Sequence, residues 1–564
     1  MSDHSVTEPQ RTPPTRAGAD GRGFRGDIQG LRAIAVLVVI GAHAVVPGFT
    51  GGFVGVDIFF VVSGFLITQL IVTGIRRDDS FSLGGFYARR ARRIVPAASL
   101  VLVVTVVASI IYFNFIDALD ATRDALWAAF FAANIRFGTQ GVDYFALEDS
   151  ASPLQHYWSL AVEEQFYIVW PLLVAVIVWA TRRRRSPGSA PVGALLAVAV
   201  VGGALSFGWS VHRTAVEPTA AYFSTLTRAW ELAVGAVLAL VVVAGRPVSR
   251  RGVTEPLALL GVAGIVYSVI TYDESMAFPG YEAALPVLSA AALLIAGAHH
   301  RSRPTLSRVL AVPPLRRIGD WSYSLYLWHW PLIVIPQVAM GRTLSPTETL
   351  IAVLLTFQFG YLTYQFVEQP FRTVPFWRTH RRGLVLYPLS LVLVLPVAAG
   401  GHVVAERLGS ERGNDPAVSA SAFGVRGDEV LGLVRASVIA GRNGTAIPSD
   451  LTPDLINLND DVADVGECNY QSPARPVCRR GDVASDKVIV VTGDSHARAW
   501  IPAFEQIAQE AGYATYYFVK QQCTAAFVDP GRLGSGDPWP ECEQFHDWVV
   551  EQVAGLQPEL MVVA

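Results

Sequence analysis

About eleven apolar segments, each long enough to cross a bilayer as a helix, recur along this chain of 564 residues. The chain is 52% hydrophobic and only 16% charged, which excludes an ordinary soluble protein of this length. The sequence therefore predicts a polytopic α-helical membrane protein. The expected spans lie near residues 28–46, 53–74, 97–115, 158–180, 191–210, 229–245, 255–272, 281–298, 319–337, 348–367 and 384–404.

The arginines are distributed very unevenly between alternate connections of these spans. One set of connections holds Arg76, Arg77, Arg89, Arg90, Arg92, Arg93, Arg182–Arg185, Arg246, Arg250, Arg251, Arg301, Arg303, Arg308, Arg316, Arg317, Arg372, Arg378, Arg381 and Arg382. The other set holds only Arg123, Arg136, Arg213 and Arg342. Cytoplasmic loops are enriched in basic residues, so this pattern predicts a multi-pass protein of the cytoplasmic membrane with its N-terminus inside. An odd number of spans then places the chain after about residue 405 outside.

The first two spans form a helical hairpin that contains three ionisable groups: Arg32, His43 and Asp57. Arg32 and His43 are spaced so that both fall on one helix face, at about 100° per residue. Counted from the turn between the spans, His43 and Asp57 fall at similar depth, so we expect the imidazole and the carboxylate to meet. Ionisable groups inside a membrane are costly and usually functional. We interpret His43 as a general base with Asp57 as its partner. The alternative is a polar trio that only stabilises helix packing.

Two further groups of polar residues carry competing interpretations. The arginines at the start of the third span favour a phosphate site, because guanidinium groups bind phosphate bidentately, although they also serve as positive-inside anchors. Glu163 and Glu164 lie side by side within a span, so at least one is expected to face a cavity.

His156 is predicted to be an interfacial residue, and His329 fits a packed side chain as well as a catalytic one. Arg228 and Glu231 are expected to form a structural ion pair.

From Lys487 the pattern changes to strand, turn, amphipathic helix and strand, which opens an α/β domain with a parallel sheet. The closing residues, PELMVVA, predict a further buried strand. Ser495 follows the first strand and opens a helix, where a nucleophile and a developing oxyanion are both favoured. The alternative is a simple turn in which Asp494 or Ser495 caps the helix.

All four cysteines lie in this hydrophilic C-terminal part. They suit disulfides in an oxidising compartment, and they allow three connectivities. Proximity in the chain favours Cys468–Cys478 and Cys523–Cys542. The net charge of −3 indicates no particular partner, and no nucleic-acid-binding signature appears. The sequence predicts neither a metal site nor an oligomeric state.

The motifs resemble those of the bacterial acyltransferase-3 family of membrane O-acyltransferases. They are Arg32-x10-His43, GVDIFFVVSGF, Arg90-x-x-Arg93, WSLAVEEQFY, RAWELAVG, SYSLYLWHWP and EQPFR. The tail resembles the SGNH domain fused to some members, through Asp494 and Ser495. The Asn and Asp-x-x-His blocks of that domain do not follow in this chain, so we expect the natural protein to continue beyond Ala564.

This resemblance implies an enzyme that takes an acyl group, usually acetyl, from cytoplasmic acyl-CoA to a hydroxyl of a cell-surface glycan outside. It implies that His43 is the base or acyl relay, supported by Asp57 and by Glu163 or Glu164. Arg32, Arg90 and Arg93 would contact the CoA phosphates or line the path of CoA. In the outer domain, Asp494 and Ser495 would belong to the first SGNH block, with Ser495 as the nucleophile. A rival hypothesis is a flippase for lipid-linked sugars with an outer binding domain. A third is an outer esterase on a membrane anchor.

The expected organisation has five parts. It comprises a disordered cytoplasmic tail (1–27), a membrane domain of ten helices (28–370), a cytoplasmic loop with an additional helix (371–404), a linker and lead-in (405–486), and the first part of a flavodoxin-like SGNH domain (487–564).

Overall fold

The computed structural model describes residues 25–78, 81–140, 151–181, 189–245, 251–273, 276–298, 304–411, 429–442, 465–468, 470, 477–521, 523–525 and 539–564. Predictions for the tail up to residue 24, for Arg182–Arg185 and for Arg246, Arg250, Arg301 and Arg303 lie outside these residues.

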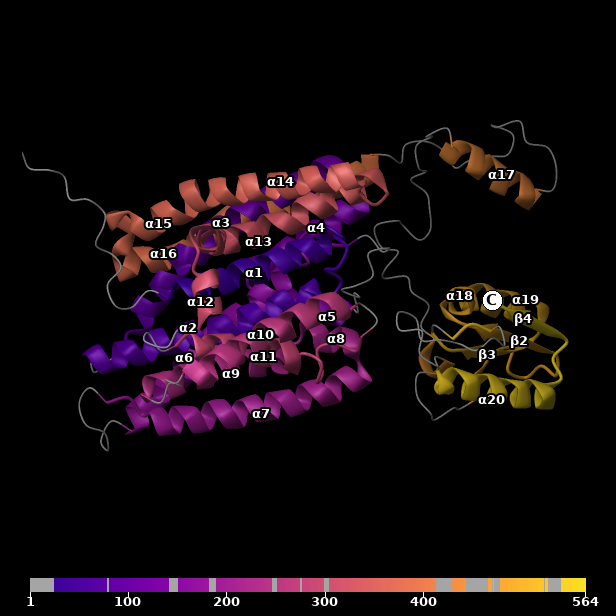
Figure 1. Cartoon of the computed structure of the whole chain (residues 1–564). Coiled ribbons are helices and arrows are strands. Elements are labelled where there is room, and N and C mark those ends of the chain that lie inside the picture. The colour runs from indigo at the N-terminus through magenta and orange to yellow at the C-terminus, as the bar shows by residue number, and fades with distance from the viewer. Residues whose placement is uncertain are drawn as a thin grey trace, which may run out of the picture.

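A bundle of long helices forms the N-terminal part of the molecule (Figure 1). Each segment expected to span contains a helix. These are α1 (Gly26–His43), α2 (Gly55–Asp78), α3 (Leu83–Tyr112), α6 (Tyr157–Thr181), α7 (Val192–Val216), α9 (Thr225–Val243), α10 (Arg251–Thr271), α11 (Ala284–Ala296), α13 (Pro313–Met340), α14 (Pro346–Thr363) and α16 (His380–Glu411).

Nine helices among the described residues are long and apolar enough to cross a membrane, two fewer than expected. The two exceptions are α11, which is shorter, and α13, which carries Arg316, Arg317, Asp320 and His329 among its apolar residues. Short helices connect the long ones: α4 (Phe115–Ala129), α5 (Ala133–Gln140), α8 (Pro218–Phe223), α12 (Thr305–Leu310) and α15 (Gln369–Thr373), with the turns η1 (Gly52–Val54), η3 (Tyr364–Glu368) and η4 (Pro375–Arg378).

Side-chain caps and prolines define several helix starts. The Ser82 hydroxyl accepts a hydrogen bond from the backbone of Gly85 at the start of α3. At α14, Ser345 and Glu348 form a reciprocal capping box that satisfies the first backbone donors. Two prolines in succession open α13, where the missing backbone donors cost nothing.

Two helix pairs in the bundle position the polar residues of interest. Helix α2 packs most extensively against α9, and α1 packs against α13. The α2–α9 contact is very close at Gly64, because a Cβ atom there would lie 1.9 Å from the backbone oxygen of Leu232. At the edge of the bundle, α7 exposes large apolar side chains such as Val201 and Leu205, as a lipid-facing helix does.

The C-terminal part contains a four-stranded sheet with helices on both faces (Figure 1). The strand order is β1 (Arg479–Gly481), β3 (Ala514–Val519), β2 (Val488–Gly493) and β4 (Leu560–Val563). Ile489 and Val491 belong to the core that includes α18 (Ser495–Ala499) and α19 (Ile501–Ala511), while Val490 belongs to the core that includes α20 (Pro540–Leu556). This alternation is the period-two pattern of a sheet buried on both faces.

The parallel sheet is confirmed for the three strands that the sequence predicted, because β2 pairs parallel with both β3 and β4. Strand β1, which was not predicted, pairs antiparallel with β3, so the sheet as a whole is mixed. The expectation that the closing strand is buried was wrong. Strand β4 is at the edge of the sheet and is largely exposed, because it pairs with β2 on one side only in the described chain. The expected linker contains the helix α17 (Glu429–Arg442), and β1 precedes the expected domain start at residue 487.

Both expected disulfides are confirmed: Cys468 is bonded to Cys478, and Cys523 to Cys542.

Candidate active site

A cavity of about 1150 Å³, its open mouth included, lies inside the helical bundle; we call it the arginine cavity. Its polar lining residues are Arg32, Ser63, Arg89, Arg90, Arg93, Ser159, Glu163, Tyr167, Ser322, Tyr323 and Tyr326. The apolar wall comes mainly from α2, through residues such as Phe59, Leu66 and Leu70. Exposed Leu70 and Arg89 mark its mouth at the arginine-rich end of the bundle. The size suits a ligand with a long apolar arm and an anionic group.

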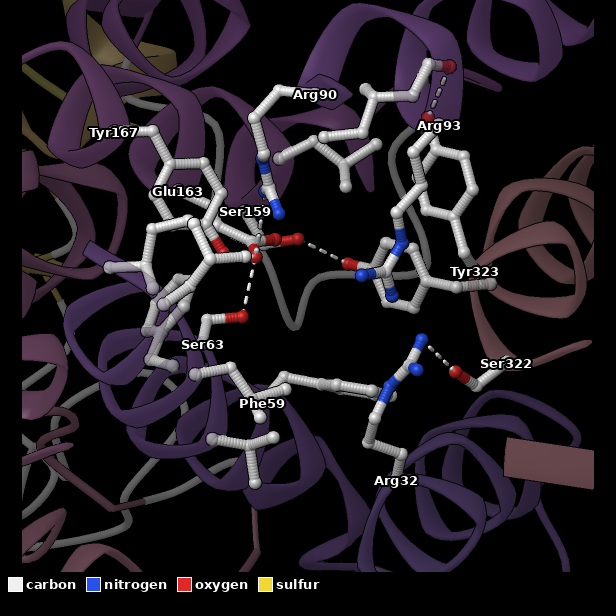
Figure 2. A pocket seen from close by; sticks show the side chains of 18 of the residues that line it. Arg32, Phe59, Ser63, Arg90, Arg93, Ser159, Glu163, Tyr167, Ser322 and Tyr323 are labelled. Carbon is white, nitrogen blue, oxygen red and sulfur yellow. Dashed lines mark hydrogen bonds and ion pairs between the residues drawn. The ribbon is translucent and has the colours of Figure 1, made fainter. Parts of the chain in front are cut away.

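Two of the arginines are available to an anion. The guanidinium groups of Arg32 and Arg93 point into the same part of the cavity (Figure 2). Arg32 donates to the Ser322 hydroxyl at 2.8 Å and to Gln29 at 3.0 Å. Within the described part of the chain, neither arginine has a carboxylate within ion-pair distance. Two buried or half-buried cations without counter-ions favour an anionic ligand.

Another arginine of the cavity, Arg90, is held by protein carboxylates instead. It lies 3.4 Å from a Glu164 oxygen and 3.7 Å from a Glu163 oxygen, and its guanidinium stacks on the Tyr167 ring at 3.7 Å. Glu163 also accepts hydrogen bonds from the Ser63 hydroxyl, at 2.5 Å, and from Tyr167 (Figure 2). Glu163 therefore does line a cavity, but both glutamates support Arg90 rather than His43. The sequence could not indicate this, because it does not say which helix face α3 turns towards α6.

Beyond the closed end of the cavity lies a pair of histidines. Nδ1 of His43 is 3.0 Å from Nε2 of His329, and the two rings are stacked. Nδ1 of His329 is in turn 2.5 Å from the backbone oxygen of Tyr326. The indole of Trp330 packs edge-on against His43, and its nitrogen donates to the backbone of Ser152 at 2.8 Å. The sequence alone does not distinguish a packed His329 from a catalytic one.

The hydrogen-bond pattern determines which ring nitrogens carry hydrogen. A backbone oxygen can only accept, so Nδ1 of His329 is the donor, and in the neutral ring its Nε2 is the acceptor. Nδ1 of His43 must then donate to His329. The lone pair of a neutral His43 is therefore on Nε2, which is the arrangement that a general base requires.

Tyr326 separates the arginine cavity from the histidines. Its hydroxyl lies 2.6 Å from the Ser159 hydroxyl and 3.1 Å from the backbone oxygen of His156, and both Tyr326 and Ser159 line the cavity. His43 is not among the lining residues. His156 is fully buried and contacts the backbone oxygen of Leu327 at 3.1 Å, so the prediction of an interfacial residue was wrong.

The expected pairing of His43 with Asp57 was also wrong. Asp57 is 1% exposed, and its Oδ1 accepts a hydrogen bond from Arg228 at 2.9 Å. His43 is not among the groups with which Asp57 interacts. His43 is the last residue of α1, and Asp57 lies in the first turn of α2. The His43 side chain contacts α13, however, whereas that of Asp57 contacts α9.

In the C-terminal domain, Ser495 opens α18 directly after β2 and is exposed. Asp494 accepts hydrogen bonds from the backbone of His496 at 2.8 Å and from its ring at 2.9 Å, so Asp494 does cap the helix. The φ angle of Gly493 is +148°, which favours glycine in the turn before them. Helix α18 has only five residues, so the expected electrostatic effect of its N-terminus is small.

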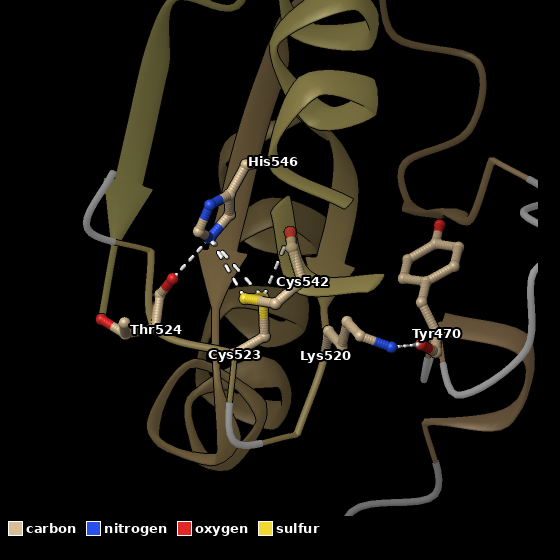
Figure 3. Close-up of a disulfide and its surroundings, with 6 residues drawn as sticks. All are labelled: Tyr470, Lys520, Cys523, Thr524, Cys542 and His546. Carbon is tan, nitrogen blue, oxygen red and sulfur yellow. Dashed lines mark hydrogen bonds between the residues drawn. A yellow bond between two sulfur atoms is a disulfide. The ribbon is translucent and has the colours of Figure 1, made fainter. Parts of the chain in front are cut away.

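His546 lies on the opposite face of the sheet from Ser495, because α18 and α20 belong to different cores. His546 belongs to α20, and its Nε2 lies 2.6 Å from the backbone oxygen of Thr524, beside the Cys523–Cys542 disulfide (Figure 3). His496 is bound to the neighbouring Asp494 instead. The described residues therefore bring no imidazole to Ser495 in the manner of a catalytic triad.

Comparison with known families gives a match for each of the two parts of the chain. Residues 25–365 match the family model described as an acyltransferase domain. The chain belongs to the acyltransferase-3 family. Residues 464–564 match a second model, described as an SGNH domain fused to domains of this family, and that match begins before the expected boundary at 487.

Three relatives illustrate the similarity of this acyltransferase-3 chain to curated proteins. A provisionally named peptidoglycan O-acetyltransferase of Bacillus subtilis, YrhL, is 35% identical over 371 residues, which cover 64% of this chain and 56% of the relative. Peptidoglycan O-acetyltransferase OatA of Listeria monocytogenes is 33% identical, with 62% and 56% covered. O-acetyltransferase OatA of Staphylococcus aureus is 31% identical, with 61% and 57% covered.

The chain thus spans a little over half the length of the curated relatives that it matches. No solved structure matches it significantly.

Proposed function

We propose that this protein is a membrane O-acetyltransferase that transfers an acetyl group from acetyl-CoA to a hydroxyl of peptidoglycan. The observation that carries the proposal is the arginine cavity. Tyr326 lines its closed end, and the backbone oxygen of Tyr326 accepts a hydrogen bond from His329, which is in turn bonded to His43. The acyltransferase family match and the names of the relatives support the reaction and its acceptor.

Acetyl-CoA suits the arginine cavity on chemical grounds. Arg32 and Arg93 offer cationic donors to the phosphates or the pantetheine carbonyls, and the apolar α2 wall offers contacts to the pantetheine arm. Arg90 is already neutralised by Glu163 and Glu164, so we assign it to shaping the cavity. The excess of arginine at this end of the bundle supports a cytoplasmic mouth, where acetyl-CoA is made available.

His43 is the proposed base. In the overall reaction, the acceptor oxygen bonds to the acyl carbon, the carbon–sulfur bond of the thioester breaks, and the acceptor proton is removed by Nε2 of His43. The thiolate of CoA takes up one proton, so the products are the ester and CoA. His329 fixes the hydrogen of His43 on Nδ1, and therefore acts as a positioning residue rather than as the base.

Ser495 is the proposed nucleophile of the outer domain. Its oxygen would bond to the acetyl carbon as the bond from that carbon to its donor breaks, and the donor's leaving group would take up the hydroxyl proton. The glycan hydroxyl would then attack this ester, and the Ser495 oxygen would leave and take up the glycan's proton. Its exposure at the end of a strand suits contact with a large polymer.

Incubating the purified full-length protein in proteoliposomes with labelled acetyl-CoA and peptidoglycan fragments is expected to release CoA and to give alkali-labile acetyl groups on the glycan. A flippase has no reason to consume acetyl-CoA, so the absence of CoA release would favour that rival. In a Ser495→Ala variant, we expect glycan acetylation to be lost. Undiminished glycan acetylation in this variant would remove Ser495 from the mechanism without affecting the membrane step.

Replacing Arg32 or Arg93 with glutamine is expected to raise KM for acetyl-CoA by about 10-fold or more, because each variant loses charge-assisted hydrogen bonds to an anionic ligand. Steady-state kinetics of CoA release provide the measurement. Arg76→Gln is the matched control, because Arg76 is at the same end of the bundle but bonds to the backbone of Val243 outside the cavity. Equal effects of all three substitutions would contradict the assignment.

A further inference from the structure

One cluster of ionisable groups in the helical bundle has no role in the proposed function. It consists of Asp57 on α2 and of Arg228 and Glu231 on α9, and all three side chains are 0–1% exposed. One guanidinium nitrogen, Nη1 of Arg228, donates to both carboxyl groups, at 2.9 Å to Asp57 and at 3.0 Å to Glu231. A single cation therefore serves two acidic side chains.

In the part of the chain that the structure describes, no second cation lies within ion-pair distance of Asp57 or Glu231. Arg228 is enclosed by the rings of Trp158, Tyr222 and Phe278, at 4.8–5.3 Å from their centroids, and its Nε donates to the backbone oxygen of Tyr222. Among the described residues, Arg228 is the cation that pairs with both carboxyl groups, and Tyr222 is the titratable side chain stacked on its guanidinium.

The charges of the cluster do not balance if both carboxyl groups are ionised. Arg228 supplies one positive charge and the two carboxylates would supply two negative ones, which leaves a net negative charge out of contact with water. Burying an uncompensated charge costs far more than burying a neutral hydrogen-bonded group. Two carboxyl groups that share one site normally retain a proton for this reason.

Two buried carboxyl oxygens without a hydrogen-bond donor independently indicate that the pair retains a proton. Oδ2 of Asp57 and Oε2 of Glu231 are both buried and have no hydrogen-bond donor. Both carboxyl groups bond to the same nitrogen, Nη1 of Arg228, so the two side chains are immediate neighbours. Two ionised carboxylates can only accept, whereas one added hydrogen makes one of them a donor and the other its acceptor. A single proton would therefore satisfy both oxygens.

We propose that Asp57 and Glu231 form a buried proton-binding site that holds one proton between them, so that the cluster with Arg228 is electrically neutral. The site is close to the arginine cavity, because Phe59 and Phe60, which follow Asp57 closely along α2, line that cavity, and Phe60 packs against Trp158. It therefore stores a proton about one side-chain layer away from the proposed binding place of the thioester.

Infrared spectroscopy of the full-length protein in proteoliposomes tests the site directly, because a protonated carboxyl group has a C=O stretch above the amide I band that shifts in D₂O. We expect Asp57→Asn and Glu231→Gln to remove the same band, each to the full extent of one carboxyl group. In either variant the remaining carboxylate is the counter-ion of Arg228, and the new amide group donates in place of the proton. Glu217→Gln, at an exposed carboxylate paired with Arg213, should leave the band unchanged.

The thermal stability of the variants provides a second measurement, which depends neither on the infrared spectrum nor on acetyl transfer. Each single amide variant keeps the cluster neutral, but the Asp57→Asn, Glu231→Gln double variant leaves Arg228 buried without a counter-ion. We therefore expect a much larger loss of thermal stability in the double variant than the sum of the single losses. If neither single variant removes the band, or if the double loss is only additive, the shared proton is excluded.

Discussion

Replacing His43 with glutamine is expected to lower the rate of acetyl transfer by about 10²–10⁴-fold, the usual contribution of a general base. Glutamine retains a polar side chain of similar size but has no titratable nitrogen, so KM for acetyl-CoA should change little, because His43 does not line the arginine cavity. Steady-state kinetics of acetyl transfer to peptidoglycan fragments separate the two parameters. His212→Gln on lipid-facing α7 is the matched control.

Variants of His329 distinguish a positioning role from a purely structural one. His329→Gln keeps an oxygen that can accept from Nδ1 of His43, whereas His329→Ala removes the acceptor. We expect the alanine variant to lose kcat well beyond the glutamine variant, at unchanged KM and with a shifted pH–rate profile. Activity of His43→Gln within about 10-fold of the wild type would refute His43 as the base, and equal losses in both His329 variants would refute its positioning role.

Replacing Gly64 with alanine is expected to destabilise the membrane domain by about 1–3 kcal/mol or more, because the new methyl group forces α2 away from α9. The added Cβ would lie 1.9 Å from the backbone oxygen of Leu232, which cannot move aside as a flexible side chain does. The thermal unfolding midpoint in detergent is the measurement.

The matched control for this prediction is Gly202→Ala on α7, where an added Cβ meets nothing within 4 Å. That substitution should be neutral or slightly stabilising, because alanine is the better helix former. A Gly64→Ala protein as stable as Gly202→Ala would show that the α2–α9 contact is looser than the structure indicates.

The sequence predicted well those features that depend on one helix at a time. Arg32 and His43 were placed on one face by their spacing alone, and both do contact α13, at Ser322 and His329. The spans were also found from apolar length, which is a property of each segment. The mixed sheet was only half predicted, because β1 is three residues long and lacks an apolar pattern.

The partners of the polar residues could not be predicted in the same way. Hydropathy does not encode which helices of a bundle are neighbours, so the sequence could not bring His329 to His43 or Arg228 to Asp57. In addition, the 3₁₀ turn η1 precedes α2 and has three residues per turn rather than 3.6, which changes the direction in which Asp57 points. The angular position of Asp57 needed the tertiary structure.

The closed end of the arginine cavity has a consequence for the permeability of the membrane to ions. An enzyme that passes a group between two compartments must not let ions or small metabolites leak along the same route. The hydroxyls of Tyr326 and Ser159, bonded to each other and to the backbone of His156, lie between the arginine cavity and the histidine pair. Under the proposed function, this bonded layer would also keep ions and small metabolites from following the acetyl group.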